Sequence, residues 1–319
     1  MIKVPEGDLD LLAIGEILVD LISVEETNTL VEANRFVRHQ GGSPANIAVN
    51  MTKLGAHTGM IARVGDDAFG RFLRGSLSRA GVETSGVTVD PEAHTSLVFV
   101  SHTAGTPDFL ACRAADFCLS PADVDEDLVR RARIVHTSMW PLSKEPSRSG
   151  VARAFQIARS HGALISLDPN YSPRIWPDRD EALHVLAEML GYATITKPSL
   201  DDARRIFDAE LEPEAYIARF HDMGPEVVVF TMGSQGVLLS EGGTVVHIPA
   251  HEIEVVDATG AGDAFWAGFL TAILDGYTPE QAAYVARVVV EEKLTHIGPL
   301  PDHMDRCAIY EQAGLMPVS

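Results

Sequence analysis

The chain has 319 residues, of which 46% are hydrophobic, 7% aromatic and 22% charged, and these are ordinary proportions for a globular protein. Its 45 acidic and 25 basic residues give a formal net charge of −20. Such a surface repels nucleic acid and anionic lipid, so we expect neither as a partner, and an anionic ligand would need a locally positive site.

The cysteines are sparse and the apolar runs are short. Cys112, Cys118 and Cys307 form no CxxC pair, which argues against a disulfide framework. The N-terminal segment reaches acidic residues before any apolar run of signal-peptide length. No run approaches the ~18–20 apolar residues of a transmembrane helix. We therefore expect a cytoplasmic protein with no part in the membrane.

The first elements in chain order are three short strands, predicted at Leu9–Ile14, Ile17–Ile22 and Phe36–His39. A helix should follow, because Ser43 is a good N-cap and Pro44 suits the first helical position. Its expected C-cap is Gly55, which can take a left-handed conformation.

A strand at Met60–Val64 and a helix from about Phe69 to Arg79 come next. Two further strand-like runs, Thr95–Ser101 and Phe109–Cys112, are joined by a Gly- and Pro-containing segment over residues 103–107. That segment predicts a hairpin turn.

From about residue 125 strands and helices alternate. The predicted strands are Ile134–His136, Leu164–Asp168, Ala193–Thr196 and Val227–Thr231, and the helices between them include Gly150–Ser160 and Asp178–Leu190. This alternation predicts an α/β fold with a doubly wound, mainly parallel sheet and helices on both faces. A late hairpin is expected between Val237–Leu239 and Thr244–Ile248, around Gly242-Gly243. No linker divides the chain, so we expect a single domain over residues 1–319.

One motif, DATGAGDAFWAGFL at residues 257–270, has the composition of a phosphate site. Gly260 and Gly262 let backbone N–H groups approach a ligand, and the apolar run after Asp263 predicts a buried helix. The N-terminus of a helix after a glycine turn favours phosphate. Asp263, in the first turn, would be a base for a hydroxyl proton, so the motif meets two needs of phosphoryl transfer.

A second motif, GGSPANIAVNMTKLG, starts at Gly41 and continues in RVGDDAFG at residues 63–70. Its glycines precede a helix N-terminus, and Asn46 in the first turn can both donate to and accept from a hydroxyl. Taken together, the two motifs resemble the two signatures of the ribokinase-like (phosphofructokinase-B type) carbohydrate kinases. The resemblance covers essentially the whole chain.

The resemblance implies a kinase that transfers the γ-phosphoryl group of ATP to a sugar hydroxyl. It implies a small β-sheet lid over the sugar, formed here by about residues 17–41 and 95–113. It makes Asp263 the catalytic base and the backbone of Gly260, Ala261 and Gly262 the anion hole. The positions that match sugar-hydroxyl contacts are Asp20, Gly41, Gly42 and Asn46.

For ATP, the segment TMGSQG matches a family nucleotide motif through Thr231, Gly233 and Gly236. Lys197, Ser199 and Asp202 stand where the family has an N-x-x-E motif that organises Mg²⁺ and phosphates, and this chain has Ser-x-x-Asp there. A shorter carboxylate can act on Mg²⁺ through water. The resemblance further implies a monovalent-cation site, for an ion such as K⁺, to which Asp257 would contribute.

The sugar is suggested by the segment DPNYSPRIW, which is similar to one in fructokinases and 2-keto-3-deoxygluconate kinases. It adds Asp168, Asn170 and Arg174 to the candidate substrate contacts, with Ser172 where the family has an arginine. Arg113 matches a lid arginine of the same subfamilies. An arginine that faces the pocket would favour a carboxylate or phosphate on the substrate, whereas a surface arginine would not. Fructokinase is the first expectation and 2-keto-3-deoxygluconate kinase the second.

Other classes lack their motifs. No G-x-G-x-x-G follows the first strand, no Gly-Lys dipeptide of a Walker motif occurs, and HExxH is absent. An inactive sugar- or nucleotide-binding regulator on the same fold is a weaker alternative, since it would be expected to lose the base. Lid strands could also pair between chains, so a homodimer through the lid is expected.

Overall fold

The computed structural model describes residues 2–103, 108–296 and 298–316. These residues form a nine-stranded main sheet in the order β13-β12-β11-β10-β9-β8-β1-β4-β5. Its strands are β1 (Leu9–Ile14), β4 (Thr58–Gly65), β5 (Val87–Asp90), β8 (Ala132–Ser138), β9 (Leu164–Asp168), β10 (Ile195–Thr196), β11 (Val227–Thr231), β12 (Val237–Glu241) and β13 (Thr244–Ile248). All pairings are parallel except those that β12 makes with β11 and β13. The predicted fold class is therefore confirmed.

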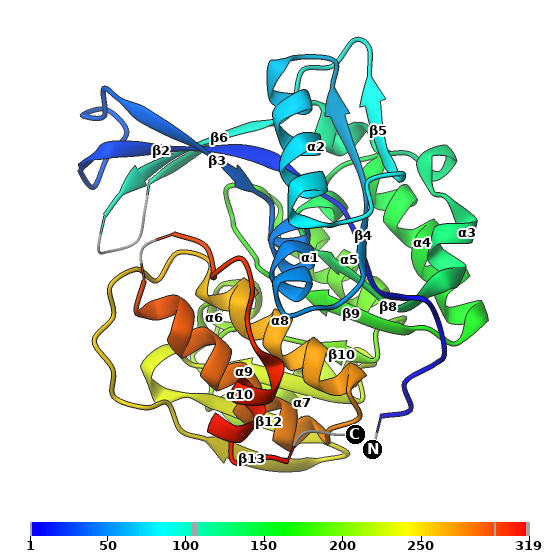
Figure 1. Ribbon diagram of the computed structural model, residues 1–319, viewed down its shortest axis with the longest axis vertical. Helices are drawn as coiled ribbons and strands as arrows, with labels where there is room; N and C mark the ends of the chain where they lie inside the picture. The colour runs from blue at the N-terminus through cyan, green and yellow to red at the C-terminus, as the bar shows by residue number, and fades with distance from the viewer. Residues whose placement is uncertain (1, 104–107, 297, 317–319) are drawn as a thin grey trace.

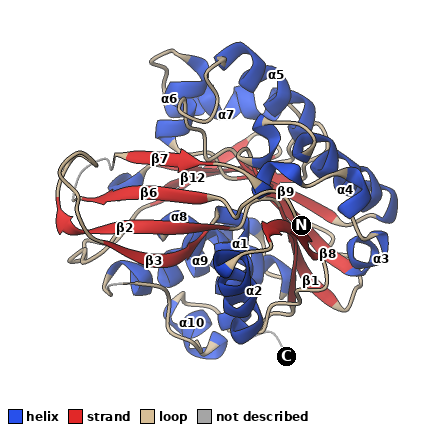
Figure 2. Ribbon diagram, turned by 90° about the horizontal axis from the view of Figure 1, so that it is seen from above, coloured by secondary structure: helices blue, strands red, loops and turns tan. Residues whose placement is uncertain are grey.

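Helices cover both faces of this sheet, as Figures 1 and 2 show. One face packs against α1 (Ser43–Lys53), α2 (Ala68–Ala80), α8 (Ala261–Leu274), α9 (Pro279–Leu294) and α10 (Arg306–Gln312). The other packs against α3 (Glu126–Arg131), α4 (Ser147–His161), α5 (Arg179–Leu190), α6 (Leu200–Phe207) and α7 (Pro213–Asp222). Burial on both sides explains why β9, with the sequence LISLD, is buried at every position instead of alternating.

A second, four-stranded sheet has the order β3-β2-β6-β7. Its strands are β2 (Leu18–Glu26), β3 (Phe36–Gly41), β6 (Leu97–His102) and β7 (Phe109–Cys112). They come from the two stretches expected to form a lid, and β6 pairs with β7 antiparallel as the predicted hairpin requires. Residues 104–107 of that hairpin turn lie outside the described residues. The sheet projects from one side of the main body (Figures 1 and 2).

The start of α1 differs from the prediction. Gly42, with a φ of 100°, is the N-cap, and Ser43 is the first helical residue. A Cβ at Gly42 would lie 2.4 Å from the Glu16 carbonyl oxygen, so both the φ and the close packing require glycine there. The expected Ser43 cap is wrong, and its hydroxyl is used elsewhere. At the other end the cap is Leu54, with Gly55 next to it at a φ of 83°.

The β12–β13 hairpin matches its prediction, and strand β5 had none. The late hairpin is confirmed, because Gly242 and Gly243 both have positive φ, at 57° and 83°, as a two-residue turn between twisted strands needs. Strand β5 was not predicted, since its four residues, Val87–Asp90, are too few to show a pattern.

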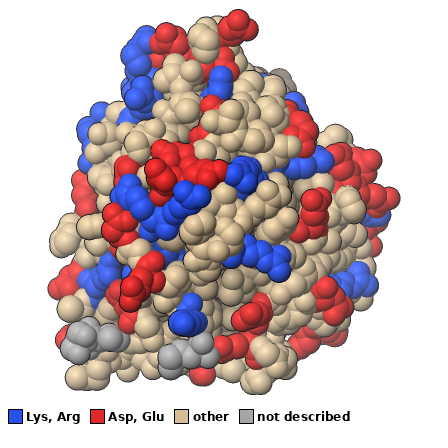
Figure 3. Space-filling view, turned by 90° about the vertical axis from the view of Figure 1, so that its right-hand side faces the viewer, with Lys and Arg blue, Asp and Glu red and all other residues tan. Residues whose placement is uncertain are grey.

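On the face drawn in Figure 3, acidic side chains are interspersed with basic ones, with no continuous basic stripe. Of the helices in the described ranges, none combines the length and apolar character needed to cross a bilayer.

Candidate active site

The carboxyl ends of the parallel strands gather the polar residues that the motifs singled out. Strand β9 ends at Asp168, Lys197 follows β10, and β11 ends at Thr231. These strands are neighbours in the sheet, so the three residues lie along one edge. With Gly262 and Asp263 they line a cavity of about 380 Å³.

Asp263 lies in the first turn of α8 and is held from the first turn of α1. Ser43 Oγ donates to one carboxylate oxygen at 2.7 Å, and Asn46 Nδ2 donates to the other at 3.0 Å. Asn46, expected to contact sugar hydroxyls, therefore also positions the expected base. Ser43, predicted only as a helix cap, is a site residue that sequence reasoning missed.

The environment of Asp263 suits proton transfer. Desolvation by the surrounding protein raises the pKa of this carboxyl above its ordinary value, while Ser43, Asn46 and Lys197 lower it. Its surface remains partly exposed, so a substrate hydroxyl can reach it. A carboxylate with a raised pKa binds a proton more tightly than an ordinary one, which makes it a better general base near neutral pH.

The N-terminus of α8 offers donors to an anion. Gly260 caps the helix with a φ of 75°, a conformation that favours glycine. Within the described ranges, the N–H groups of Gly260 and Gly262 donate to no protein acceptor, whereas that of Ala261 donates to the Ala258 carbonyl oxygen at 3.1 Å. Two free N–H groups and the positive end of the helix together favour a phosphate oxygen here.

Lys197 adds a positive charge at the same place. A Cβ on Gly262 would lie 3.7 Å from Lys197 Nζ. The ammonium also forms an ion pair with Asp168 at 2.8 Å, and both side chains are buried. Burial raises the pKa of Asp168 to about 6 against the opposing effect of Lys197. Because an ammonium has three donors, Lys197 can hold Asp168 and still donate to an anion.

The two glycines before α1 lie against carboxyl-bearing residues. A Cβ on Gly41 would lie 2.1 Å from Asp20 Oδ2, so only glycine leaves room for this carboxylate. No side chain in the described part of the chain donates a hydrogen bond to Asp20. Burial, and the charge of Asp263, raise the pKa of Asp20 to about 7. Asp20 and Asp263 are thus close enough for the charge of one to act on the other, although they come from different ends of the sequence and Asp20 does not line the cavity beside Asp263.

Glu16 contacts the start of α1, next to the residue that holds Asp263, and was not predicted. It accepts from the Ser43 N–H at 3.2 Å and from Ser138 Oγ at 3.1 Å, and it is buried. Burial raises its pKa to about 8. The signal that could have found it is a carboxyl inside the apolar run LLAIGEILV. Glu16 supports the turn at Gly42 from which Ser43 reaches the base.

The glycines of the TMGSQG segment have different surroundings. Gly233 has a φ of 58° and nothing within 4 Å of an added Cβ, whereas a Cβ on Gly236 would lie 2.2 Å from the Ile248 carbonyl oxygen. Gly236 is therefore required by packing against β13, and Gly233 is the glycine with room for a ligand. Thr231 lines the cavity.

Ser199 and Asp202 line the same cavity and form a reciprocal cap on α6. Asp202 N donates to Ser199 Oγ at 3.0 Å, and Ser199 N donates to Asp202 Oδ2 at 3.0 Å. The other carboxylate oxygen accepts from Tyr171 N at 2.7 Å. Asp202 thus has a structural role in positioning the loop that follows β9.

The candidate sugar-contact arginines are both engaged by the protein. Arg113 is buried, donates to Asp116 at 2.8 Å and stacks over Trp140. Arg174 donates to Asp108 at 2.7 Å, which joins the loop after β9 to the start of β7. Asn170 lines the cavity with a φ of 36°. Both guanidinium groups are ion-paired within the protein, although Arg113 Nη2 forms no hydrogen bond in the described part of the chain.

Asp257 does not have the surroundings of an open cation site. Its carboxylate accepts from Thr259 N at 2.9 Å, Gly298 N at 3.1 Å and Lys293 Nζ at 3.1 Å. Desolvation raises the pKa of Asp257, but these hydrogen bonds outweigh it and lower the pKa to about 2. The carboxylate is ionised, and its positive partner is a lysine.

Another cavity of about 380 Å³ lies at the opposite, amino-terminal end of β1 and β4. Its charged residues pair with one another, because Arg131 contacts Asp8 at 3.0 Å and Glu83 at 3.1 Å. Thr52 and Gly55 of the second motif line it, but none of the candidate catalytic, substrate or nucleotide residues does, so the cavity beside Asp263 is the candidate active site.

Comparison with known proteins decides the family. Residues 8–302 match the family described as "pfkB family carbohydrate kinase". The chain belongs to this family. It is similar to an ATP-dependent 6-phosphofructokinase of Thermoanaerobacterium thermosaccharolyticum, at 35% identity over 93% of this chain and 91% of the relative. This kinase therefore transfers a phosphoryl group to an alcohol group of a carbohydrate.

Solved structures agree with the fold of the kinase. A fructokinase of Halothermothrix orenii is 39% identical over 92% of this chain and all of that chain, with a TM-score of 0.79. A sugar kinase of Pyrococcus horikoshii in complex with ATP is 31% identical over 95% and 99%, with a TM-score of 0.85. A Vibrio cholerae fructokinase double mutant with fructose, ADP and potassium ion shares the fold at 24% identity over 97% and 99%, with a TM-score of 0.84.

Proposed function

We propose that this kinase phosphorylates fructose, with ATP as the donor and Asp263 as the general base. The observation that carries the proposal is a carboxylate held by Ser43 and Asn46 at the N-terminus of α8, beside free backbone donors. This arrangement can accept a hydroxyl proton and stabilise phosphate charge at one point.

The proposed reaction follows from these positions. A sugar hydroxyl gives its proton to an oxygen of Asp263 as its own oxygen attacks the γ-phosphorus, and the bond to the leaving ADP oxygen breaks. The N–H groups of Gly260 and Gly262, with Lys197, stabilise the charge on the transferred phosphoryl group. Thr231 and Gly233 would contact the nucleotide, since both lie at the carboxyl edge beyond β11.

Mg²⁺ fits the acids around the cavity without a dedicated cage. In the described ranges no cluster of three or more ligating side chains is preformed, but Asp168 and Asp202 line the cavity. Mg²⁺ commonly binds through one or two carboxylates, several waters and substrate phosphates. When bound, the ion would neutralise phosphate charge, and Asp202 would reach it through water.

A neutral sugar suits this pocket better than an acidic or phosphorylated one. Asp20 and Asp263 are carboxyls, and Arg113 and Arg174 are already paired with Asp116 and Asp108. A carboxylate or phosphate on the sugar would therefore meet repulsion without a free guanidinium to offset it. Fructose fits this condition, and the ketodeoxygluconate and fructose 6-phosphate alternatives do not.

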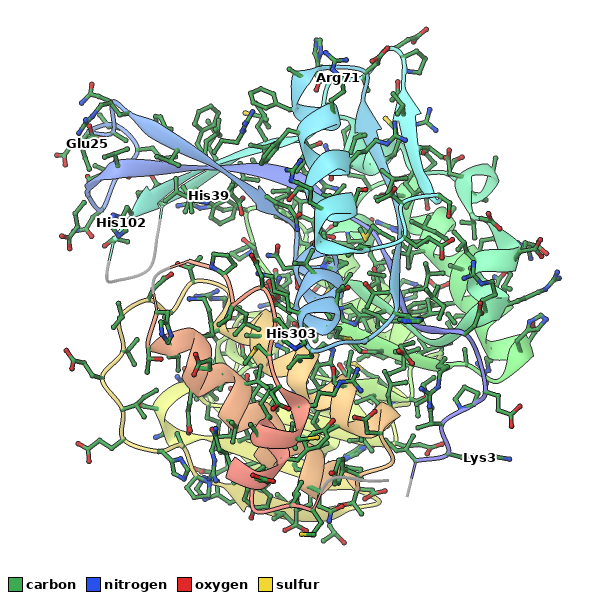
Figure 4. All side chains as sticks on the ribbon, in the orientation of Figure 1. Lys3, Glu25, His39, Arg71, His102 and His303 are labelled. Atoms are coloured by element: carbon green, nitrogen blue, oxygen red, sulfur yellow. The ribbon has the colours of Figure 1, made fainter. Side chains whose placement is uncertain are left out.

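The second sheet would close over the sugar and could join two copies. Asp20 lies on β2 opposite His39 of β3, and Figure 4 shows His39 on this sheet, with Glu25 and His102 farther out. A sheet that carries a sugar contact can exclude water from the reaction when it moves inward. Val37 is 49% exposed and Leu110, on the opposite face of the sheet by its register, is 57% exposed. A homodimer through this lid stays a prediction.

The test is ADP release with Mg²⁺-ATP and equal concentrations of fructose, 2-keto-3-deoxygluconate and fructose 6-phosphate. We expect the highest kcat/KM with fructose and an unchanged ranking in Arg113→Ala and Arg174→Ala. Faster turnover of either anionic sugar, lost selectively in one arginine variant by about tenfold or more, would overturn the fructose assignment.

A further inference from the structure

The loop that leads to the anion-binding glycines is fastened by a buried lysine from a different element. Lys293, in the last turn of α9, donates from Nζ to the Asp257 carbonyl oxygen at 3.0 Å and to Asp257 Oδ2 at 3.1 Å. Its side chain is only 5% exposed. The ammonium thus binds both the backbone and the side chain of the residue that opens the DATGAGD motif.

Two further hydrogen bonds join the segment at Asp257 to the end of α9 and to the residues that follow it. The Leu294 carbonyl oxygen accepts from Val256 N at 2.8 Å, and Gly298 N donates to Asp257 Oδ2 at 3.1 Å. The chain at Asp257 therefore runs against the end of α9, and the lysine fills the space between them. Three residues later the same chain reaches Gly260.

The oxygens that contact Lys293 are of the kind that bind K⁺. Backbone carbonyl oxygens replace the hydration shell of K⁺ in proteins, and a carboxylate adds a negative charge. The resemblance noted in the sequence predicted a K⁺ at Asp257. The ion does not fit here, because a resident ammonium already contacts the Asp257 carbonyl and carboxylate oxygens and would repel a second cation a few ångströms away.

We infer that Lys293 substitutes for a monovalent cation and makes this kinase independent of K⁺. The ammonium holds Asp257 and its loop, and the loop holds the N–H groups of Gly260 and Gly262 where the transferred phosphate needs them. Lys293 does not line the cavity beside Asp263, so its role is that of a positioning residue. The inference rests on the proposed phosphoryl transfer at Asp263.

The first experiment is made on the wild-type enzyme. ADP release with fructose and Mg²⁺-ATP is measured in KCl, NaCl and choline chloride at one ionic strength. We expect kcat to agree within about twofold in the three salts. Activation of the wild type by K⁺ of about fivefold or more would overturn the inference.

The second experiment removes the charge in Lys293→Met, which keeps the length of the side chain. In choline chloride kcat should fall by about tenfold or more with a smaller change in KM for fructose, because the anion hole acts in the transition state. KCl or methylammonium chloride should restore a large part of the loss. An unchanged kcat, or a loss that neither cation restores, would overturn the inference, and Lys293→Gln is the second variant if Lys293→Met does not fold.

A binding readout separates this inference from the proposed function. The Tm of Lys293→Met should rise in KCl relative to choline chloride, since a cation that binds only the folded state stabilises it, whereas the Tm of the wild type should not. Equal salt responses of the two proteins would overturn the inference even if no sugar is phosphorylated. If no sugar is turned over but the Tm responses differ, the proposed function fails and the cation substitution stands.

Lys53→Met is the matched control. Lys53 is also buried, and its Nζ donates to the Leu300 carbonyl oxygen at 2.6 Å, but it has no contact with the Asp257 loop among the described residues. This variant should lose stability with no gain of K⁺ response. A K⁺ response equal to that of Lys293→Met would show a general effect of removing a buried lysine, and would overturn the specific role of Lys293.

Discussion

Strand β9, which ends beside the candidate anion site, is covered by helices on both faces of the main sheet. The second sheet, in contrast, is partly open to solvent. Every residue of β9 is buried, while Val37 of β3 and Leu110 of β7 are 49% and 57% exposed. A strand sealed on both faces holds its terminal side chains in fixed positions, and a half-exposed sheet opens at lower free energy. The proposed base thus stands on the more rigid part, and the proposed sugar contact Asp20 on the proposed lid.

The largest expected effect is on the rigid side. Asp263→Asn should lower kcat by about three orders of magnitude or more, because the amide cannot accept the hydroxyl proton. Binding of fructose and ATP, measured by calorimetry, should remain within a few-fold of wild type. Turnover near the wild-type rate would remove Asp263 from the role of base and would break the contrast between the two regions.

The next effect concerns stability at the junction of the two sheets. The folded-state pKa of Glu16 is raised from 4.5 to about 8, so the folded protein binds this proton more tightly than the unfolded chain. The contribution of Glu16 to the free energy of unfolding is therefore fully present below pH 4.5 and is lost as the pH rises toward 8. Each pKa unit corresponds to about 1.4 kcal/mol.

Glu16→Gln removes this titration, so wild type should lose stability between pH 5 and 8 while the variant does not. The difference in the free energy of unfolding, variant minus wild type, should therefore increase by on the order of 3 kcal/mol over this range. Urea unfolding across this range measures the difference, and any constant cost of the amide cancels. A difference that stays flat with pH would mean that Glu16 titrates normally in the folded protein.

A smaller effect is expected from the residue that holds the base. Ser43→Ala removes a hydrogen bond to a charged group, worth about 1.5–3 kcal/mol, which corresponds to roughly a tenfold to 150-fold loss in kcat/KM. Because the Ser43 bond lowers the pKa of Asp263, its loss should move the acidic limb of the pH–rate profile to higher pH. Ser23→Ala on β2, distant from Asp263 in the hydrogen-bond network, is the control that should leave that limb in place.

The smallest effect belongs to the second sheet. Arg174→Ala breaks the exposed ion pair with Asp108, worth about 0.2–1 kcal/mol. It should increase hydrogen exchange in β6 and β7 without sugar, while β8 and β9 stay protected. Fructose should restore protection to β6 and β7 if the sheet closes over it. Equal protection with and without fructose would argue against a closing lid.

Much of the fold followed from local patterns. The bounds of β7, β9, β11 and β13 were predicted without error, because each is a short apolar or β-branched run between turn residues. The start of α8 was also predicted locally, because a glycine turn precedes the apolar run that follows Asp263. Ser43 could not be assigned correctly, since a serine before a proline is a good helix cap locally and its partner lies 220 residues away.

The sequence by itself determined the family and the fold class, and it led to the proposal of Asp263 as the base, because these depend on periodicity and on contiguous motifs such as DATGAGD. Only the tertiary structure decided what each charge contacts: Arg113 with Asp116, Lys197 with Asp168 and Lys293 with Asp257. A charged side chain has no periodic signature, and its partner is set by which strand ends and helix ends the packed sheet brings together.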